Sequence, residues 1–238
     1  MANSKIEWTH HGFNPWIGCQ KVSPGCDHCY AEREMDHRYH FVQWGPHGER
    51  RRTSVEYWKG PRRWARAAQK NGERVLVFCA SHADWLDNQV PPQWRTDLAR
   101  EIEATPELIW QLLTKRIENY WRLAPWLEAP QNVWLGVTAE DQLHYEKRWA
   151  ILRDIPARVR FISYEPALGP LIITGTQVPD WIICGGESGL GARMMDPAWA
   201  RALRDQCRAR GIPFFMKQMT GKKPIPADLL VREFPNGL

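Results

Sequence analysis

Three cysteines lie close together near the start of the chain, with the spacing Cys19-x6-Cys26-x2-Cys29. Thiolates are the preferred ligands of soft metal centres. Residues 23–25 (SPG) lie between the first two cysteines and favour a tight turn that would let the sulfur atoms converge. Three thiolates on a 4Fe-4S cluster leave one iron open for an exchangeable ligand, because full protein ligation takes four. The spacing therefore predicts a metal centre with one open position.

Two other interpretations of these cysteines stay open. Structural zinc takes four protein ligands, and His28, His10 or His11 could complete such a set. Alternatively, the three thiols are buried and bind nothing. A disulfide framework is not expected, because the remaining cysteines of the six are scattered along the chain, at Cys79, Cys184 and Cys207. A tight cluster plus scattered cysteines favours a metal in a reducing compartment.

The elements that must position these residues alternate along the chain. Six apolar segments have the composition of strands buried on both faces, and they span residues 74–80, 108–114, 132–138, 158–164, 181–185 and 213–217. A further short strand is expected around residues 12–16, just before the cysteines. Helices are expected between the strands, over residues 31–41, 61–71, 92–104, 141–153 and 197–210. The last helix has the clearest limits, with Asp196 as N-cap, Pro197 at its first position and Gly211 at its end.

This alternation predicts an α/β fold with six or seven βα units and a parallel sheet. We expect one domain over residues 1–238, closed as a partial or complete parallel barrel, with a doubly wound open sheet as the alternative. Residues 38–60 are rich in His, Arg, Trp and Gly and are expected to form an irregular insertion over one end.

Charged and small residues follow the predicted strands directly, as in LLTKR, ISYEP and CGGES. Sites in parallel α/β folds lie at the carboxyl ends of the strands. The candidate site residues at these ends are Lys115, Glu140, Glu165, Gly185, Gly186 and Glu187. Loops are polar in most proteins, so ion pairs across the barrel mouth are the alternative role for any one of them.

Residues 13–31 (FNPWIGCQKVSPGCDHCYA) resemble the opening of radical S-adenosylmethionine enzymes, which carry three cysteines on the loop after the first barrel strand. They are more similar still to a phage- and bacteria-associated, DUF5131-like family of uncharacterised three-cysteine proteins. The segments LLTKR, NVWLGVTAE, SYEPALGP, WIICGGESG and FFMKQ follow in that family's order, so the resemblance spans almost the whole chain. The opening also resembles the spore photoproduct lyase group, which repairs DNA.

The chain departs from the radical-enzyme pattern at two points. The common spacing is Cys-x3-Cys-x2-Cys, whereas the first gap here has six residues. The aromatic residue that usually precedes the third cysteine is replaced by His28, and Tyr30 follows that cysteine instead.

The resemblance implies a barrel of the radical-enzyme type and a 4Fe-4S cluster on Cys19, Cys26 and Cys29. The open iron would bind S-adenosylmethionine, and an electron from a donor would then produce a 5′-deoxyadenosyl radical that abstracts hydrogen from the substrate. Carboxylates suit the sulfonium and the ribose hydroxyls of this cofactor, which makes Glu140, Glu165 and Glu187 candidates. Gly185 and Gly186 would let the backbone approach it, and Lys115 could face a carboxylate or phosphate.

Charge and hydropathy indicate which classes of partner the chain could bind. The chain has a net charge of +5, and residues 49–52 and 62–64 combine arginines with tryptophan nearby, so nucleic acid is the candidate partner or substrate. The 14 tryptophans serve either packing or base stacking. No apolar run reaches the ~18 residues of a membrane span, and the start of the chain has no signal-peptide pattern. We therefore expect a cytoplasmic protein with no membrane partner.

Three functions follow from these features. The first is a radical S-adenosylmethionine-like iron–sulfur enzyme that acts on nucleic acid or a nucleotide. The second is a zinc-stabilised nucleic-acid-binding module without catalysis. The third is an iron–sulfur protein that never meets S-adenosylmethionine.

Overall fold

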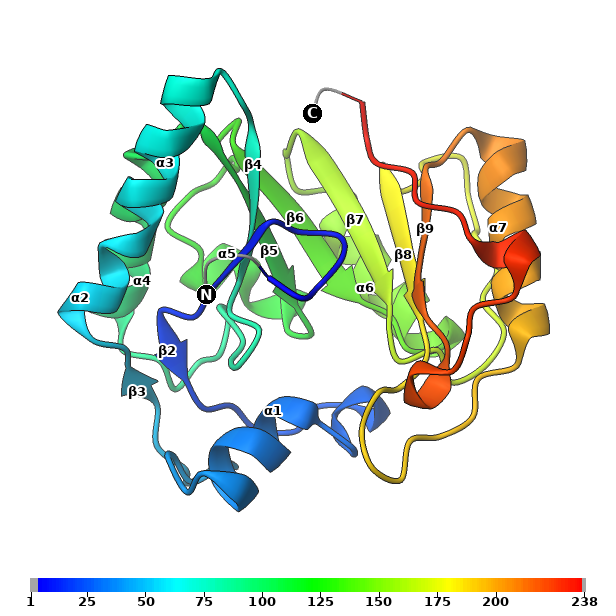
Figure 1. The fold of residues 1–238 in the computed structure, drawn as a ribbon, viewed down its shortest axis with the longest axis horizontal. Coiled ribbons are helices and arrows are strands. Elements are labelled where there is room, and N and C mark those ends of the chain that lie inside the picture. Colours follow the sequence, from blue (N-terminus) through cyan, green and yellow to red (C-terminus); the bar gives the residue numbers. More distant parts are fainter. Residues whose placement is uncertain (1–3, 237–238) are drawn as a thin grey trace.

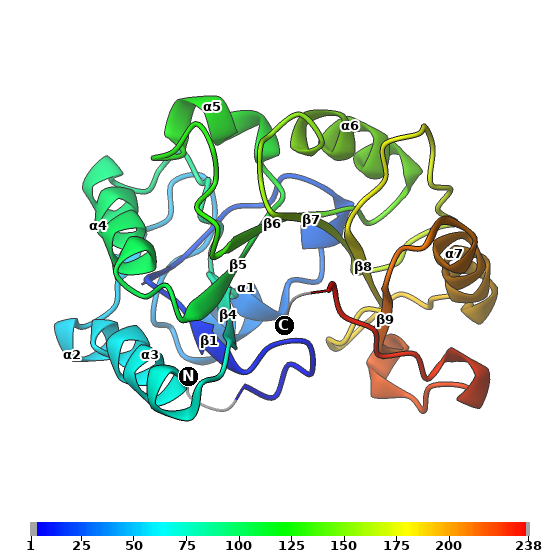
Figure 2. The same cartoon turned by 90° about the horizontal axis from the view of Figure 1, so that it is seen from above.

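The computed structural model describes residues 4–236 and is built on a parallel sheet of seven strands. The strands, in sheet order, are β1 (His11–Phe13), β4 (Val75–Cys79), β5 (Leu108–Thr114), β6 (Val133–Thr138), β7 (Val159–Tyr164), β8 (Trp181–Gly185) and β9 (Phe214–Gln218). The order in the sheet follows the order in the chain, and the sheet curls into a half-barrel (Figure 1, Figure 2). The predicted α/β fold with a partial parallel barrel is confirmed, and the order of the described strands lacks the reversal that a doubly wound sheet has.

Helices cover the convex face of this half-barrel (Figure 2). They are α3 (Gly60–Asn71), α4 (Pro92–Glu103), α5 (Tyr120–Leu123), α6 (Gln142–Leu152) and α7 (Pro197–Arg210). The expected caps are present, since Asp196 accepts a hydrogen bond from the amide of Ala198 and Gly211 has the left-handed φ of 67°. Four of the five expected helices are therefore confirmed nearly to the residue. None of the described helices is both long and apolar enough to cross a membrane.

The helix expected over residues 31–41 differs from the prediction. Only α1 (Tyr30–Glu32) is α-helical, and a π-helix continues it over Arg33–Arg38. The helical segment stops there because His40 takes a positive φ of 47° and the chain turns into the insertion. Single turns of π-helix occur often at functional sites.

The insertion at residues 38–60 is largely irregular, as expected. It contains β3 (Arg51–Arg52), which pairs with β2 (Trp16–Ile17), and the short helix α2 (Val55–Trp58). Arg50 anchors it, because this buried side chain binds Asp87 at 2.6 Å and three backbone carbonyls of the insertion. The insertion is thereby fixed beside the start of the cysteine loop, the name used here for residues 18–29.

The strands bury both of their faces, which explains their nearly continuous apolar sequences. One core lies between the sheet and its helices, and a second, largely aromatic core fills the concave face. Trp8 enters that second core from the N-terminal segment and packs 4.6 Å from Phe78 and 6.2 Å from Trp181 between ring centroids. Packing therefore accounts for many of the tryptophans, six of which are fully buried: Trp8, Trp16, Trp85, Trp110, Trp134 and Trp181.

Side chains on the concave face change character along the strands. The amino-terminal half is filled by the aromatic core, and Gly136 is required there because a Cβ atom would lie 2.2 Å from the Phe161 ring. The carboxyl-terminal half presents Thr138, Ser163 and Lys217 to a pocket instead. The change in residue type along the strands thus separates an aromatic core from a pocket that also has polar side chains in its wall.

Candidate metal and cofactor site

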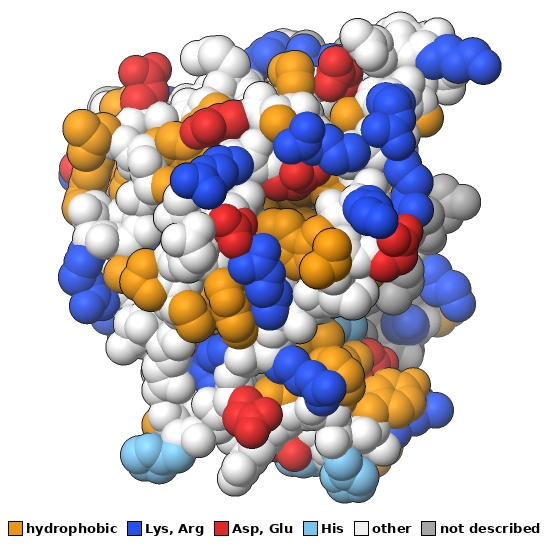
Figure 3. Space-filling model, turned by 90° about the vertical axis from the view of Figure 1, so that its left-hand side faces the viewer, with side chains coloured by type: hydrophobic (Ala, Val, Ile, Leu, Met, Phe, Trp, Pro, Cys, Tyr) orange, Lys and Arg blue, Asp and Glu red, His pale blue; other side chains and the backbone are white. Residues whose placement is uncertain are grey.

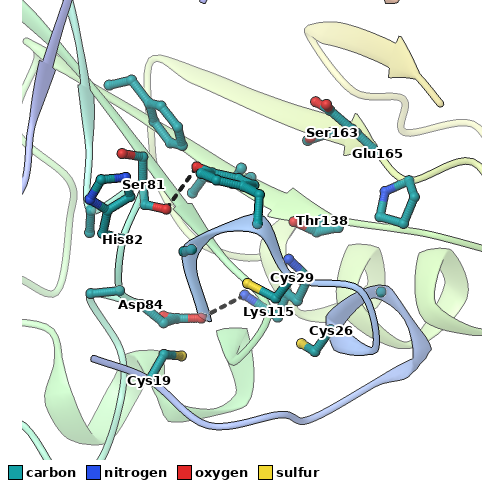
Figure 4. Close-up of a pocket in the computed structure, with 18 of the residues that line it drawn as sticks. Cys19, Cys26, Cys29, Ser81, His82, Asp84, Lys115, Thr138, Ser163 and Glu165 are labelled. Carbon is teal, nitrogen blue, oxygen red and sulfur yellow. Dashed lines mark hydrogen bonds between the residues drawn. The ribbon is translucent and has the colours of Figure 1, made fainter. Parts of the chain in front are cut away.

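A pocket of about 410 Å³ lies at the carboxyl ends of the strands. The cysteine loop and α1 lie over these strand ends (Figure 1). All three cysteines line the pocket, together with residues that follow the strands, among them Ser81, His82, Asp84, Lys115, Glu165 and Lys217 (Figure 4). The strand-end residues are therefore brought together with the cysteines. Tyr30 joins them, since its hydroxyl donates a hydrogen bond to the Ser81 carbonyl at 2.8 Å.

Local structure places each sulfur. Cys26 ends the 3-10 turn Pro24–Cys26, and Cys29 occupies the N-cap position of α1. Cys19 is held by the insertion, because the Gly45 amide donates to its carbonyl at 2.9 Å. All three are half-buried, whereas Cys79, Cys184 and Cys207 are fully buried in the core between sheet and helices. Cys184 is thus the buried strand cysteine of a packed core.

Of the histidines proposed as a fourth zinc ligand, His10 and His11 contact β4 and α3, whereas His28 lines the same pocket as the cysteines. His10 accepts a hydrogen bond from the Leu76 amide at the start of β4, and His11 stacks on Trp64. His28 lies 3.6 Å from Glu187. Among residues 4–236, no group of three or more His, Cys, Asp and Glu side chains is placed to share a single metal ion.

Thiols are nevertheless the ligand type that an iron–sulfur cluster takes. A cluster is larger than a single ion, and each thiolate binds a different iron. Three half-buried thiols face one pocket and have two cationic side chains beside them, Lys115 and Arg116. Positive charge next to the thiols compensates the negative charge that thiolates bring to such a centre.

Arg116 joins the first cysteine to the sheet. Its Nη1 lies 3.3 Å from the Cys19 sulfur and 3.3 Å from Asp84 Oδ2, and its Nη2 donates to the Gln20 carbonyl at 2.9 Å. Burial raises the pKa of the Cys19 thiol to about 12, although Arg116 acts to lower it. Asp84 also accepts from the amide of Lys115, as Figure 4 shows.

Lys115, which follows β5, lies near Cys29 (Figure 4). Burial by itself would lower the pKa of Lys115, but the charges of Cys26, Cys29 and Glu140 raise it above its usual value. Its ammonium therefore stays charged beside the thiols. That Lys115 faces a carboxylate or phosphate of a ligand stays a prediction.

Glu140 lies beneath the cysteine loop and is not among the residues that line the pocket. It is fully buried and forms an ion pair with Arg148 at 2.6 Å. Burial would raise the pKa of this carboxyl, but Arg148, the Ser23 hydroxyl and Lys115 together hold it below its usual value. The structure therefore places Glu140 where it supports the loop. Arg148, which sequence reasoning missed, is its partner.

Glu187 lines the pocket but is engaged in a similar way. Arg193 binds its two carboxylate oxygens at 2.6 and 3.1 Å, and the same guanidinium donates to the Pro24 carbonyl at 2.8 Å. Burial opposes ionisation of Glu187, but the hydrogen bonds from Arg193 lower its pKa overall. The loop after β8 is thereby tied to the cysteine loop. Arg193 was not expected from the sequence, because no local pattern pairs it with either loop.

Glu165 is the predicted carboxylate with the most direct access to the pocket. It lines the pocket, forms an ion pair with Lys217 and accepts a longer hydrogen bond of 3.4 Å from Gln218. Gly185 and Gly186 lie behind it and outside the pocket lining. Gly186 has no room for a side chain, since a Cβ atom would lie 2.4 Å from the Thr220 nitrogen. Close backbone packing, more than approach to a ligand, accounts for this glycine.

A protein-family model described as "Protein of unknown function (DUF5131)" matches residues 3–228. The chain belongs to the DUF5131 family. No curated protein and no solved structure matches the chain in the other two comparisons. The DUF5131 match includes the cysteine loop, the insertion and every strand of the half-barrel. The similarity of the predicted segments to this family is therefore confirmed over nearly the full length.

The basic segments of this DUF5131 chain are largely ion-paired. Arg62 binds Glu101, Arg63 binds Glu56, and Arg52 binds Asp97 while stacking over a tryptophan ring. Figure 3 shows the face formed by α2, α3 and α4, where Lys and Arg are interspersed with Asp and Glu. These arginines are therefore fixed by carboxylates, and the proposed nucleic-acid partner stays a prediction.

Proposed function

We propose that the chain is a radical S-adenosylmethionine-like iron–sulfur enzyme. Cys19, Cys26 and Cys29 would hold a 4Fe-4S cluster, and S-adenosylmethionine would bind in the pocket at the strand ends. The observation that carries the proposal is that three half-buried thiols from one loop face a pocket lined by strand-end carboxylates and ammonium groups. The resemblance of the cysteine loop to that of radical enzymes supports the same assignment.

The bound groups would supply one-electron cleavage of a carbon–sulfur bond, and thus a 5′-deoxyadenosyl radical. The residues of this chain would bind S-adenosylmethionine and orient it in the pocket. Glu165 is the carboxylate available to the ribose hydroxyls or the sulfonium, with Lys217 and Gln218 holding it in place. Lys115 offers a buried ammonium to an anionic group. Glu140 and Glu187 act indirectly, through the loops that they anchor.

The inner end of the pocket is apolar. The aromatic core with Trp8 and Phe78 forms its inner end, and Tyr30 on α1 lies over the strand ends. Reactive intermediates survive longer where solvent is excluded. The half-barrel thus supplies an apolar inner end and polar strand-end groups in one pocket.

Oxygen-free reconstitution with iron and sulfide tests the proposal. We expect the wild-type protein to bind close to four irons per chain, as a 4Fe-4S cluster requires, and to form 5′-deoxyadenosine when reduced with S-adenosylmethionine. Cys26→Ala should lose both properties. Cys207→Ala, which changes a buried cysteine of α7, is the matched control and should keep them.

Each other outcome has a definite meaning. A cluster that forms without cleavage of S-adenosylmethionine would make the chain an iron–sulfur protein of another kind. A colourless protein that takes up zinc and no iron would overturn the proposal and support the zinc-stabilised binding module.

The substrate that we propose is nucleic acid or a nucleotide. Among the described residues, five cationic side chains line the pocket against three carboxylates, so the charge around it favours an anionic substrate. The cations are Lys5, Lys115, Arg116, Lys217 and Lys222, and the carboxylates are Asp84, Glu165 and Glu187. A labelled single-stranded oligonucleotide should bind more weakly to Lys222→Met than to wild type, and binding should fall steeply with salt. Lys147→Met, on the exposed side of α6, is the control. Binding that is independent of salt and of Lys222 would contradict this substrate class.

A further inference from the structure

We infer that Arg116 is a positioning residue for Cys19, and that its hydrogen bond to the sulfur raises the reduction potential of the cluster. The inference rests on the proposed iron–sulfur function and deepens it. Arg116 and Cys19 are 97 positions apart in the sequence, but only 3.3 Å separates the Nη1 atom of Arg116 from the Cys19 sulfur.

The guanidinium of Arg116 is held rigidly. Only 3% of its side chain is exposed, and it contacts three groups at once: the Cys19 sulfur, the Asp84 carboxylate and the Gln20 carbonyl. A guanidinium is planar and always charged, so its donors keep fixed directions once two of them are engaged. The donor to Cys19 is therefore pre-oriented rather than recruited when a cluster binds.

Asp84 fixes the arginine from the sheet side. Its carboxylate accepts hydrogen bonds from the Thr114 hydroxyl at 2.7 Å, from the Lys115 amide at 2.9 Å and from the Leu86 amide at 2.9 Å. These partners belong to the end of β5 and to the loop after β4. Asp84 also forms the ion pair with Arg116. Residues at two strand ends therefore hold the arginine that contacts Cys19.

Cys19 is held from its other side as well. Gly18 has a φ of 112°, and a Cβ atom there would lie 2.4 Å from the Glu49 carbonyl oxygen. The Gly18 amide donates to the His82 carbonyl at 3.1 Å. The backbone of Cys19 thus has little freedom to move its sulfur away from Arg116.

The three cysteine sulfurs therefore differ in the groups that lie beside them. Cys29 has the backbone amides of Ala31 and Glu32 at the start of α1 beside its sulfur. Within residues 4–236, Cys19 alone of the three has a charged side chain donating to its sulfur. Hydrogen bonds to ligating sulfurs withdraw electron density and favour the reduced, more negative state of a cluster. A charge-assisted donor has the larger effect.

The midpoint potential of the reconstituted protein tests this inference, with Arg116→Met as the main variant. Oxygen-free titration with dithionite, followed by electron paramagnetic resonance, measures the potential directly. We expect the equilibrium constant for one-electron reduction to fall about tenfold or more, which corresponds to about 59 mV. Arg153→Met, at an exposed site after α6, is the control and should match wild type.

A second variant keeps the test decisive if Arg116→Met does not load iron. Arg116→Gln keeps a side-chain donor but loses the charge, and we expect a shift in the same direction. A wild-type protein that loads iron, with variants at an unchanged potential, overturns the inference and leaves the proposed function standing. A wild-type protein that takes up no iron overturns both.

Discussion

Glu140, which follows β6, accepts a hydrogen bond at 3.3 Å from the amide of Gly25, the residue before Cys26. A Cβ atom at Gly25 would lie 3.1 Å from the carboxyl carbon, so the loop rests closely on this side chain. The carboxylate of Glu140 is in turn neutralised by Arg148 on α6. One buried ion pair therefore supports the part of the loop that carries the second cysteine.

Replacing Glu140 by Gln should destabilise the fold strongly. The substitution leaves Arg148 as a buried charge without its partner, which costs about 3–5 kcal/mol in proteins where this has been done. Unfolding in urea, measured by tryptophan fluorescence, gives the free energy. Glu146→Gln, at an exposed position of α6, is the control. Equal losses in the two variants would contradict the role given to the buried pair.

The same ion pair predicts a pH dependence of stability. The pKa of Glu140 is lower in the folded protein than its ordinary value of 4.5, so the unfolded chain binds this proton more tightly. The stabilisation is therefore complete above that ordinary value and is lost as the pH falls through the lower folded value. The stability difference between wild type and Glu140→Gln should shrink as the pH falls below about 4.5. A difference that stays constant down to the acid transition would contradict the prediction.

Gly18→Ala should have a lower melting temperature than Gly175→Ala, the matched glycine variant. Gly18 and Gly175 both have positive φ, at 112° and 78°, but of the two only Gly18 has atoms within 4 Å of the place that a Cβ would take. Left-handed backbone by itself costs about 1–2 kcal/mol for a non-glycine residue, which is the loss expected for Gly175→Ala. The contact with the Glu49 carbonyl adds to this in Gly18→Ala. Thermal unfolding of both variants measures the difference, and equal melting temperatures would refute it.

Arg193→Met should loosen the cysteine loop without unfolding the half-barrel. The variant loses the hydrogen bond to the Pro24 carbonyl and the pair with Glu187, which together tie two loops. Trypsin should then cleave after Lys21 several-fold faster, with cleavage sites identified by mass spectrometry. Arg201→Met, which breaks an exposed ion pair with Asp228 on the far side of α7, is the control. An unchanged cleavage rate at Lys21 would show that the loop is held by other contacts.

The sequence by itself determined the strands, four helices and the set of residues at the strand ends. These follow from local patterns, because buried parallel strands are continuously apolar and capping residues lie next to the helix ends in the sequence. The gathering of Lys115, Glu165 and the cysteines at one end then follows from parallel topology alone. The family assignment rests on the same segments.

Only the tertiary structure decided which charged residues are available to a ligand in the pocket and which hold its walls. Glu140 and Glu187 look equivalent to Glu165 in the sequence, yet the first two hold the cysteine loop together with Arg148 and Arg193, whereas Glu165 pairs with Lys217 in the pocket wall. Arg116 reaches Cys19 across 97 positions. Apolar periodicity is a property of neighbouring residues, whereas an ion pair depends on where the curvature of the sheet brings distant strand ends, and no local pattern encodes that distance.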